Sequence, residues 1–150
     1  MKVVVDTNIV FSAILNTDGK IGNLLLTSQG TFEFYSAEYL RIEIGRYDDK
    51  LRSLSGLTEE QLGEAKYHIF NKISFLSEVQ ISGEIWHASV PLVKEVDMDD
   101  IAFVAMSKYL QTILWTGDKK LQKGLIKKGF TSVMNTQQLL DLRQKIETDM

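Results

Sequence analysis

The chain has 150 residues, of which 44% are hydrophobic and 25% are charged, and its formal net charge is −3. This composition is typical of one globular domain, expected here to span residues 1–150, and it excludes collagen-like and disordered chains. The sequence has no cysteine, which excludes disulfides, thiolate nucleophiles and zinc–thiolate sites.

The N-terminal segment predicts a strand and not a targeting signal. Its run of three valines ends at Asp6, which makes it too short for the apolar region of a signal peptide. No later stretch offers the roughly 18 uncharged apolar residues that a membrane span needs. We therefore expect a soluble, cytoplasmic protein that does not contact a membrane.

Short, continuously apolar segments predict strands of a parallel sheet that is buried on both faces. In chain order the predicted strands are residues 2–5, 32–36, 77–81, 112–116 and 131–134. The first segment, KVVV, and the fourth, TILWT, carry the clearest signal.

Helical patterns lie between these strands. One apolar stripe predicts a helix over residues 38–51 and is formed by Leu40, Ile44, Tyr47 and Leu51. A second stripe, preceded by a capping box at Thr58 and Gln61, is formed by Leu62, Ala65, Ile69 and Ile73. Residues 101–106 are apolar all round and predict a buried helix. The alternation of strands and helices predicts an α/β layer fold with crossover helices.

Acidic residues stand at four places in this scheme. They are Asp6 after the first strand, Glu43 in the helix of residues 38–51, the group Asp97, Asp99 and Asp100 before the buried helix, and Asp118 after the strand of residues 112–116. In open α/β sheets the functional groups lie beyond the carboxyl ends of the strands. Asp6 and Asp118 are both expected there.

Each acid also has an ordinary structural interpretation. Asp6 and Asp118 are favoured N-cap residues for the helices that follow them. The group at 97–100 suits the first turn of a helix, where the helix dipole stabilises negative charge. We interpret Asp99 in this way, as a cap or a surface charge, whereas Asp97 and Asp100 are three residues apart and share one face. Glu43 has Arg46 nearby and is also explained as a surface charge.

Convergence of these acids would require a cation, because carboxylates at close range repel one another. Oxygen ligands favour Mg²⁺ or Mn²⁺, and one or two ions would fit. The only histidines, His68 and His87, lie in unrelated contexts, which excludes a histidine-rich site. A hard metal ion held by carboxylates is suited to phosphodiester hydrolysis.

Five lysines and no acid occur between Lys119 and Lys128, although the chain as a whole is acidic. One interpretation of this run is a solvated helix face. The position beside Asp118 favours a surface that holds the phosphates of a nucleic acid, with Lys119, Lys120 and Lys123 as the contacts.

The segments VVVDTNIVFSAIL, LRIEI and DMDDIAFVAMSKYLQTILWTGDKKL, in this order, resemble the PIN-domain ribonucleases over essentially the whole chain. More narrowly they are similar to the VapC-like toxin components of toxin–antitoxin pairs. The resemblance implies a three-layer α/β/α sandwich with a parallel, five-stranded sheet. It also implies Mg²⁺- or Mn²⁺-dependent endoribonuclease activity, frequent homodimers and inhibition by an antitoxin protein.

The family's metal-binding and catalytic acids fall on Asp6, Glu43, Asp100 and Asp118, and an additional metal-binding acid falls on Asp97. In this interpretation Asp6, Asp100 and Asp118 bind metal, while Glu43 binds a second ion or orients the attacking water. The supporting polar positions of the family fall on Asn8, Ser12, Thr116 and Gly117. Residues 52–90 match no family motif, so the substrate stays open, and the stripe within residues 58–76 offers one candidate dimer surface.

Two other functions remain as alternatives. A haloacid-dehalogenase-like phosphatase also places an aspartate after its first strand, but it needs a second acid where this chain has Asn8. A PIN-like scaffold that binds RNA or protein without catalysis would gain nothing from clustered acids. Two aromatic positions are also open: Trp115 stacks a base or fills the core, and Trp86 with His87 contacts RNA or a partner or anchors a loop.

Overall fold

A computed structural model describes residues 1–150 of the chain. The strands are β1 (Lys2–Val5), β2 (Glu33–Ala37), β3 (Ile73–Leu76), β4 (Ile113–Trp115) and β5 (Val133–Met134). The helices are α1 (Thr7–Leu15), α2 (Lys20–Thr27), α3 (Tyr39–Arg46), α4 (Asp48–Ser55), α5 (Glu59–Phe70), α6 (Gly83–Val93), α7 (Ile101–Leu110), α8 (Lys119–Lys127) and α9 (Thr136–Thr148). Two short 3₁₀ helices, η1 (Glu78–Gln80) and η2 (Met98–Asp100), precede α6 and α7.

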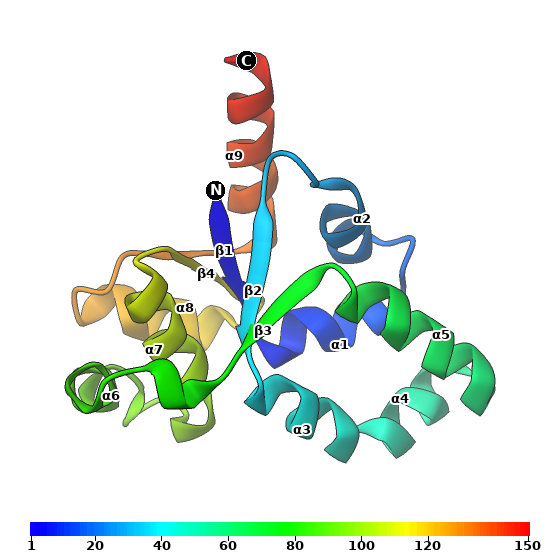
Figure 1. The fold of residues 1–150 in the computed structure, drawn as a ribbon, viewed down its shortest axis with the longest axis horizontal. Helices are drawn as coiled ribbons and strands as arrows, with labels where there is room; N and C mark the ends of the chain where they lie inside the picture. The colour runs from blue at the N-terminus through cyan, green and yellow to red at the C-terminus, as the bar shows by residue number, and fades with distance from the viewer.

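The five strands form one sheet in the order β3-β2-β1-β4-β5, and every neighbouring pair is parallel. Helices cover both faces of this sheet, with α6, α7 and α8 on one side and α1 to α5 on the other (Figure 1). The predicted three-layer α/β/α sandwich with a parallel five-stranded sheet is confirmed. All carboxyl ends of the strands therefore lie at one edge of the sheet.

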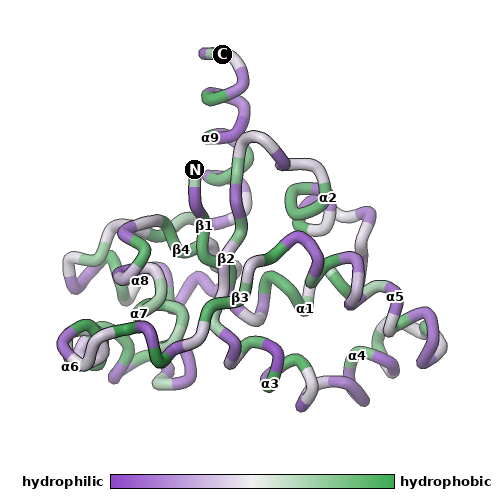
Figure 2. The backbone as a smooth tube through the Cα atoms, in the orientation of Figure 1, coloured by the Kyte–Doolittle hydropathy of each residue, from purple (hydrophilic) through white to green (hydrophobic).

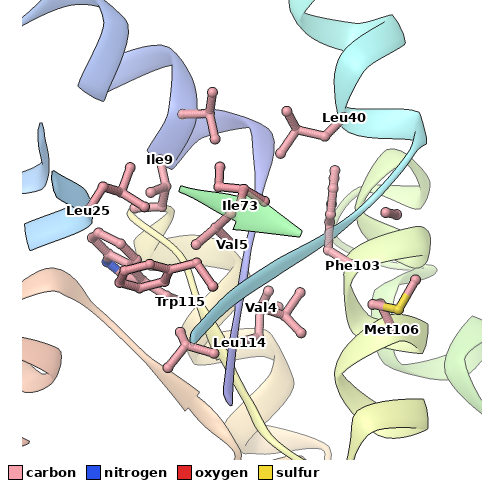
Figure 3. Packing of buried hydrophobic residues seen from close by; sticks show 14 of the residues in the cluster. Val4, Val5, Ile9, Leu25, Leu40, Ile73, Phe103, Met106, Leu114 and Trp115 are labelled. Atoms are coloured by element: carbon pink, nitrogen blue, oxygen red, sulfur yellow. The ribbon is translucent and has the colours of Figure 1, made fainter. Parts of the chain in front are cut away.

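The core is built by side chains that alternate between the two faces of the central strands. Val5 pairs in register with Trp115, and the preceding Val4 pairs with Leu114. Phe103 and Met106 of α7 lie on one side of these strands, while Ile9 of α1 and Leu25 of α2 lie on the other (Figure 3). Burial of both faces explains why the strands are apolar without alternation, which is the pattern of a parallel sheet.

The helices differ in how much apolar surface they bury. Residues 102–106 of α7 are buried and Ile101 is half-buried, as the sequence predicts. Helix α9, in contrast, alternates hydrophilic and hydrophobic residues along its length (Figure 2) and buries only Leu139 fully. None of the helices combines the length and the hydropathy that crossing a membrane requires.

The strand predicted at residues 77–81 is wrong. The third strand of the sheet is Ile73–Leu76, and its pairing with β2 ends at Leu76. Ser77 then accepts a hydrogen bond from the backbone N–H of Val79 and starts η1. Val79, an apolar residue in the middle of the predicted strand, is 91% exposed and belongs to no sheet.

The helix predicted at residues 38–51 is interrupted. It ends at Arg46 and restarts at Asp48, because the backbone of Tyr47 leaves the helical conformation at φ −99° and ψ 9°. Leu40, Ile44 and Leu51 are buried as predicted, but Tyr47 is 40% exposed and its ring packs edge-on against Phe11. The break turns the chain from α3, which follows β2, toward α5.

The second predicted stripe is correct except at its end. The capping box forms, with Thr58 Oγ1 accepting from the Gln61 N–H at 3.1 Å and Gln61 Oε1 accepting from the Thr58 N–H at 3.0 Å. Leu62 and Ile69 are buried and Ala65 is half-buried on α5. Ile73 is buried too, but it lies in β3, since the helix ends at Phe70.

Trp115 is part of the hydrophobic core. Its side chain is fully buried, and its indole N–H donates to Thr136 Oγ1 at 3.1 Å. The interpretation of Trp115 as a base-stacking residue is therefore wrong. Trp115→Ala should lower the free energy of unfolding by about 3–5 kcal/mol, whereas Leu54→Ala, at a 59% exposed position, should change it by less than about 0.5 kcal/mol. Urea denaturation measures both, and equal effects would contradict the assignment of Trp115 to the core.

Candidate metal centre

The first two acids of the centre lie at the ends of adjacent strands. Asp6 follows β1 and Asp118 lies three residues beyond β4, and these strands are paired in register. Asp6 Oδ1 accepts a hydrogen bond from the Ile9 N–H at 3.0 Å, and Asp118 Oδ1 accepts from Lys120 and Leu121 at 2.9 and 3.1 Å. Both aspartates are therefore N-caps, but each cap uses only one of the two carboxylate oxygens.

The second oxygen of Asp6 has no partner. Asp6 is only 2% exposed, and its Oδ2 is the single buried side-chain nitrogen or oxygen atom in the protein without a hydrogen bond. The Thr116 side chain lies close by, but it does not supply Oδ2 with a hydrogen bond. A buried polar atom left unsatisfied costs about 1–3 kcal/mol, and more when it is charged. Such a cost is expected at a site that binds a ligand.

Glu43 reaches the centre from α3 and is held in place by Thr7. Its side chain is buried, and its Oε1 accepts a hydrogen bond from Thr7 Oγ1 at 2.5 Å. Thr7 directly follows Asp6, so this bond ties α3 to the end of β1. The interpretation of Glu43 as an exposed surface charge is wrong. Thr7 is a further residue of the centre that was not predicted, although its place immediately after the first acid was a signal.

The third group of acids approaches on the N-terminal side of α7. Helix α7 packs against β1, β2 and β4, and Asp100 is the half-buried residue directly before it. The Asp100 side chain makes no capping bond, so both of its oxygens stay available. Asp97 is exposed and accepts from the Asp99 N–H at 2.9 Å, which caps η2. Asp99 is exposed as well.

The electrostatics show that these acids influence one another. Burial raises the pKa of Asp6 to about 6; the Thr116 side chain and the Ile9 N–H oppose this, and the charges of Asp118 and Glu43 add to it. Burial also raises the pKa of Asp100 to about 8, and the charges of Asp6, Asp97, Asp118 and Glu43 contribute in that order. The pKa of Glu43 is raised mainly by burial, against the Thr7 hydrogen bond. The charges of Asp6, Asp97, Asp118 and Glu43 thus all act on the Asp100 carboxyl.

The acidic side chains are of the type that binds a hard cation, but their positions do not form a set of ligands around one point. The donors are carboxylate oxygens, which Mg²⁺ and Mn²⁺ prefer, and the buried Asp6 Oδ2 has no hydrogen-bond partner within the protein. No three acidic side chains, however, are positioned as ligands of one ion. Carboxylates that repel one another separate, so the side chains must turn toward a common point to bind an ion.

Of the remaining predicted residues, Thr116 supports an acid directly, whereas Asn8 and Ser12 do not. Thr116 is buried, and its Oγ1 accepts from the Asp118 N–H at 3.1 Å, which fixes the turn that presents Asp118. Gly117 lies in that turn. Asn8 is exposed and Ser12 is half-buried on α1, and no side-chain hydrogen bond joins either of them to the acids.

The lysines of α8 form an open basic face next to Asp118. Lys119, Lys120 and Lys123 are exposed, while Leu121 and Leu125 point into the core. None of these three lysines forms an ion pair, since the lysine ion pairs of the protein involve Lys66 and Lys128. Their ammonium groups are free for an external anion.

The fold and the acids together define an α/β protein with an acidic centre at the carboxyl edge of a parallel sheet. The model of the PIN domain matches residues 4–145, so the chain belongs to the PIN-domain family. The predicted family is confirmed. No curated protein sequence matches the chain.

Solved structures share this fold at low sequence identity. VapBC2 from Rickettsia felis, bound to a DNA fragment from its promoter, superposes with a TM-score of 0.66 and 13% identity, covering 90% of this chain and 98% of that one. PAE2754 from Pyrobaculum aerophilum gives a TM-score of 0.67 and 11% identity, with 97% and 90% covered. A toxin–antitoxin complex from Klebsiella pneumoniae gives 0.60 and 15%, with 89% and 97% covered.

The raised pKa values of Asp6 and Asp100 predict a pH-dependent stability in EDTA. Between their ordinary pKa of 3.8 and the folded values of about 6 and about 8, the folded chain holds protons that the unfolded chain has released. The free energy of unfolding should therefore fall as the pH rises. Asp100→Asn should flatten this dependence and stabilise the protein at pH 8 by about 1–3 kcal/mol, discounted for the partial exposure of Asp100.

Urea denaturation from pH 5 to 8 measures this effect. The exposed Asp49→Asn serves as a control that should keep the full pH dependence of the unmutated protein. An unchanged pH dependence in Asp100→Asn would show that Asp100 is not strained by its acidic neighbours.

Proposed function

We propose that this protein is a metal-dependent endoribonuclease that hydrolyses RNA phosphodiester bonds. The observation that carries the proposal is the unpaired, buried Oδ2 of Asp6, surrounded by the charges of Asp118, Glu43 and Asp100. A protein gains nothing from this arrangement unless a cation neutralises it. Membership of the PIN-domain family supports nuclease activity.

In this proposal Asp6, Asp100 and Asp118 hold one or two Mg²⁺ or Mn²⁺ ions, with Asp97 as an additional ligand. A bound ion of this kind supplies an activated water and stabilises negative charge on the leaving oxygen. The caps at Asp6 and Asp118 keep one oxygen of each side chain fixed by backbone N–H groups, which leaves the other oxygen of each for a ligand. Thr116 fixes the turn that carries Asp118.

Glu43 has a separate role in the same chemistry. The Thr7 hydroxyl donates to Oε1 and leaves Oε2 available to water or an ion. Burial raises the pKa of the Glu43 carboxyl, which favours its protonated form. We assign Glu43 the task of orienting the attacking water or binding the second ion. Asn8 and Ser12 of α1 are assigned a supporting role beside the first acid.

We further propose that the protein is the toxin of a toxin–antitoxin pair, that it acts in the cytoplasm and that it forms a homodimer. Two of the structural neighbours are a VapBC complex and a toxin–antitoxin complex, which supports a protein antitoxin as partner. A role in RNA processing without an antitoxin is the second possibility within the nuclease interpretation.

The absence of three acids positioned around one point favours a second candidate function, a PIN-like scaffold that binds RNA or protein without cutting. A scaffold has no use for an ion, and in that case the acids would stay dispersed. Nuclease assays distinguish the two functions.

Purified protein should cleave unstructured or structured RNA with Mn²⁺ or Mg²⁺ and not in EDTA. Asp6→Asn and Asp118→Asn should each lower the rate by at least about 100-fold, because each removes a carboxylate charge from the ion. Asp49→Asn, which lies on α4 away from the centre, should stay within about twofold of the unmutated rate. Circular dichroism confirms that each variant is folded. Cleavage by Asp6→Asn and Asp118→Asn at the unmutated rate would contradict the proposed metal centre.

The basic face of α8 makes its own prediction. Lys119→Gln and Lys123→Gln should each weaken RNA binding in EDTA regardless of RNA sequence, and each should reduce the slope of log K against log salt by about 0.7. Lys145→Gln, at an exposed position of α9 outside this face, should change neither quantity. Fluorescence anisotropy at several salt concentrations measures the slopes, and an equal or larger effect of Lys145→Gln would contradict the proposed surface.

A further inference from the structure

A hollow in the surface lies next to the acidic centre, and the proposed chemistry does not use it. Its volume is about 320 Å³, and it is lined by Tyr39, Glu78, Trp86, Met98, Asp99 and Ala102. The lining is mainly apolar, with carboxylates at its border. Pockets that hold part of a small ligand have volumes of this order.

The hollow and the acidic centre share two of their walls. Tyr39 and Glu43 are four residues apart on α3, so they lie on the same face one turn from each other, with Cβ atoms about 5–6 Å apart. Asp99 directly precedes Asp100. The charges of Glu43 and Asp99 both act on the Tyr39 hydroxyl, and Asp99 also acts on Glu43, which confirms that these groups are close. A nucleotide bound at the acids therefore has this hollow within its reach.

The apolar part of the hollow offers surfaces on which a planar ring can stack. Trp86 is half-buried in α6, and Met98, another lining residue, is 45% exposed. Tyr39 forms part of the wall, but its ring already packs against Phe103, with centroids 6.3 Å apart, and lies under the Arg46 guanidinium at 5.9 Å. Trp86 is therefore the surface open for stacking. Trp115 differs from Trp86, since it is fully buried with its N–H bonded to Thr136. Aromatic side chains that are open to solvent beside a nuclease centre are the usual platforms for unstacked RNA bases.

The polar part of the hollow accepts hydrogen bonds and repels phosphates. Asp99 is exposed, and its side chain makes no hydrogen bond within the protein. Glu78 Oε1 accepts a hydrogen bond from the Tyr39 N–H at 2.9 Å, and Oε2 is left for another donor. Two carboxylates exclude the RNA backbone from this place, whereas the basic face of α8 attracts it. The hollow is therefore complementary to the N–H groups of a base.

We propose that this hollow binds one guanine base of the RNA, stacked on Trp86, with its Watson–Crick edge donating to Asp99. The proposal rests on the proposed function and names the substrate contact of the same site. Guanine presents two neighbouring donors, N1–H and N2–H, which match the two oxygens of one carboxylate. Adenine and cytosine present one amino group on that edge and uracil one imino group, so each makes a single such bond.

The test measures binding in EDTA, where metal-dependent cleavage is absent. The probes are fluorescein-labelled nine-nucleotide RNAs of uridine with guanosine, adenosine or cytidine at the centre, beside the all-uridine strand, and anisotropy gives each affinity. The guanosine strand should bind at least about 5-fold more tightly than the other three. Asp99→Asn should remove this preference, while Asp49→Asn should keep it.

The aromatic platform is tested separately. Trp86→Ala should weaken binding of all strands by at least about 5-fold, and Trp86→Phe should restore most of the loss because it keeps a stacking face. Asp99 is exposed, so Asp99→Asn should fold normally. Its effect on the guanosine preference therefore tests the proposal even if Trp86→Ala does not fold.

Equal affinity for the four strands, or a guanosine preference that survives in Asp99→Asn, would overturn the proposal. The absence of RNA binding would overturn it too, and would leave the hollow to an apolar side chain of a protein partner. Cleavage assays judge the nuclease proposal independently. If the protein prefers guanosine but does not cleave RNA, only the proposed nuclease activity is refuted. If it cleaves RNA without a base preference, only the proposed guanine site is refuted.

Discussion

The parallel pairing of β1 with β4 brings two carboxylates to one edge of the sheet, and the whole acidic centre depends on it. The register is set by apolar side chains: Val5 lies beside Trp115, and both are fully buried. A shift by one residue would turn these side chains to the opposite faces and separate Asp6 from Asp118. Hydrophobic burial therefore supplies the free energy that holds mutually repelling charges close together.

Local structure and function do not compete at these positions. Asp6 and Asp118 start α1 and α8 as N-caps, and the caps orient the same carboxylates that face the centre. The Thr7–Glu43 bond then joins α3 to the first strand, while α7 brings Asp100 in through its contacts with the sheet. Each acid is held by a different element, so the centre exists only in the folded chain.

The sequence was most informative where the chemistry is local. Asp6 and Asp118 could be predicted because each follows an apolar strand, and residues 101–106 because they are apolar on every side. The break at Tyr47 and the exposed Val79 could not be predicted, since tertiary packing decided whether their apolar side chains were buried. The Thr7–Glu43 bond and the hollow beside Trp86 join segments that are distant in sequence, and no periodic pattern reports such contacts.

Titration calorimetry with Mn²⁺ tests the central claim most directly, because it asks whether the clustered carboxylates hold a cation, whatever the substrate. The unmutated protein should bind one or two ions per chain, and the heat should be lost in Asp6→Asn while it remains in Asp49→Asn. Proton release at pH 7 should accompany binding, since Asp100 must lose its proton to become a ligand. No binding by the folded protein, or identical binding by Asp6→Asn, would contradict a metal centre at this edge of the sheet.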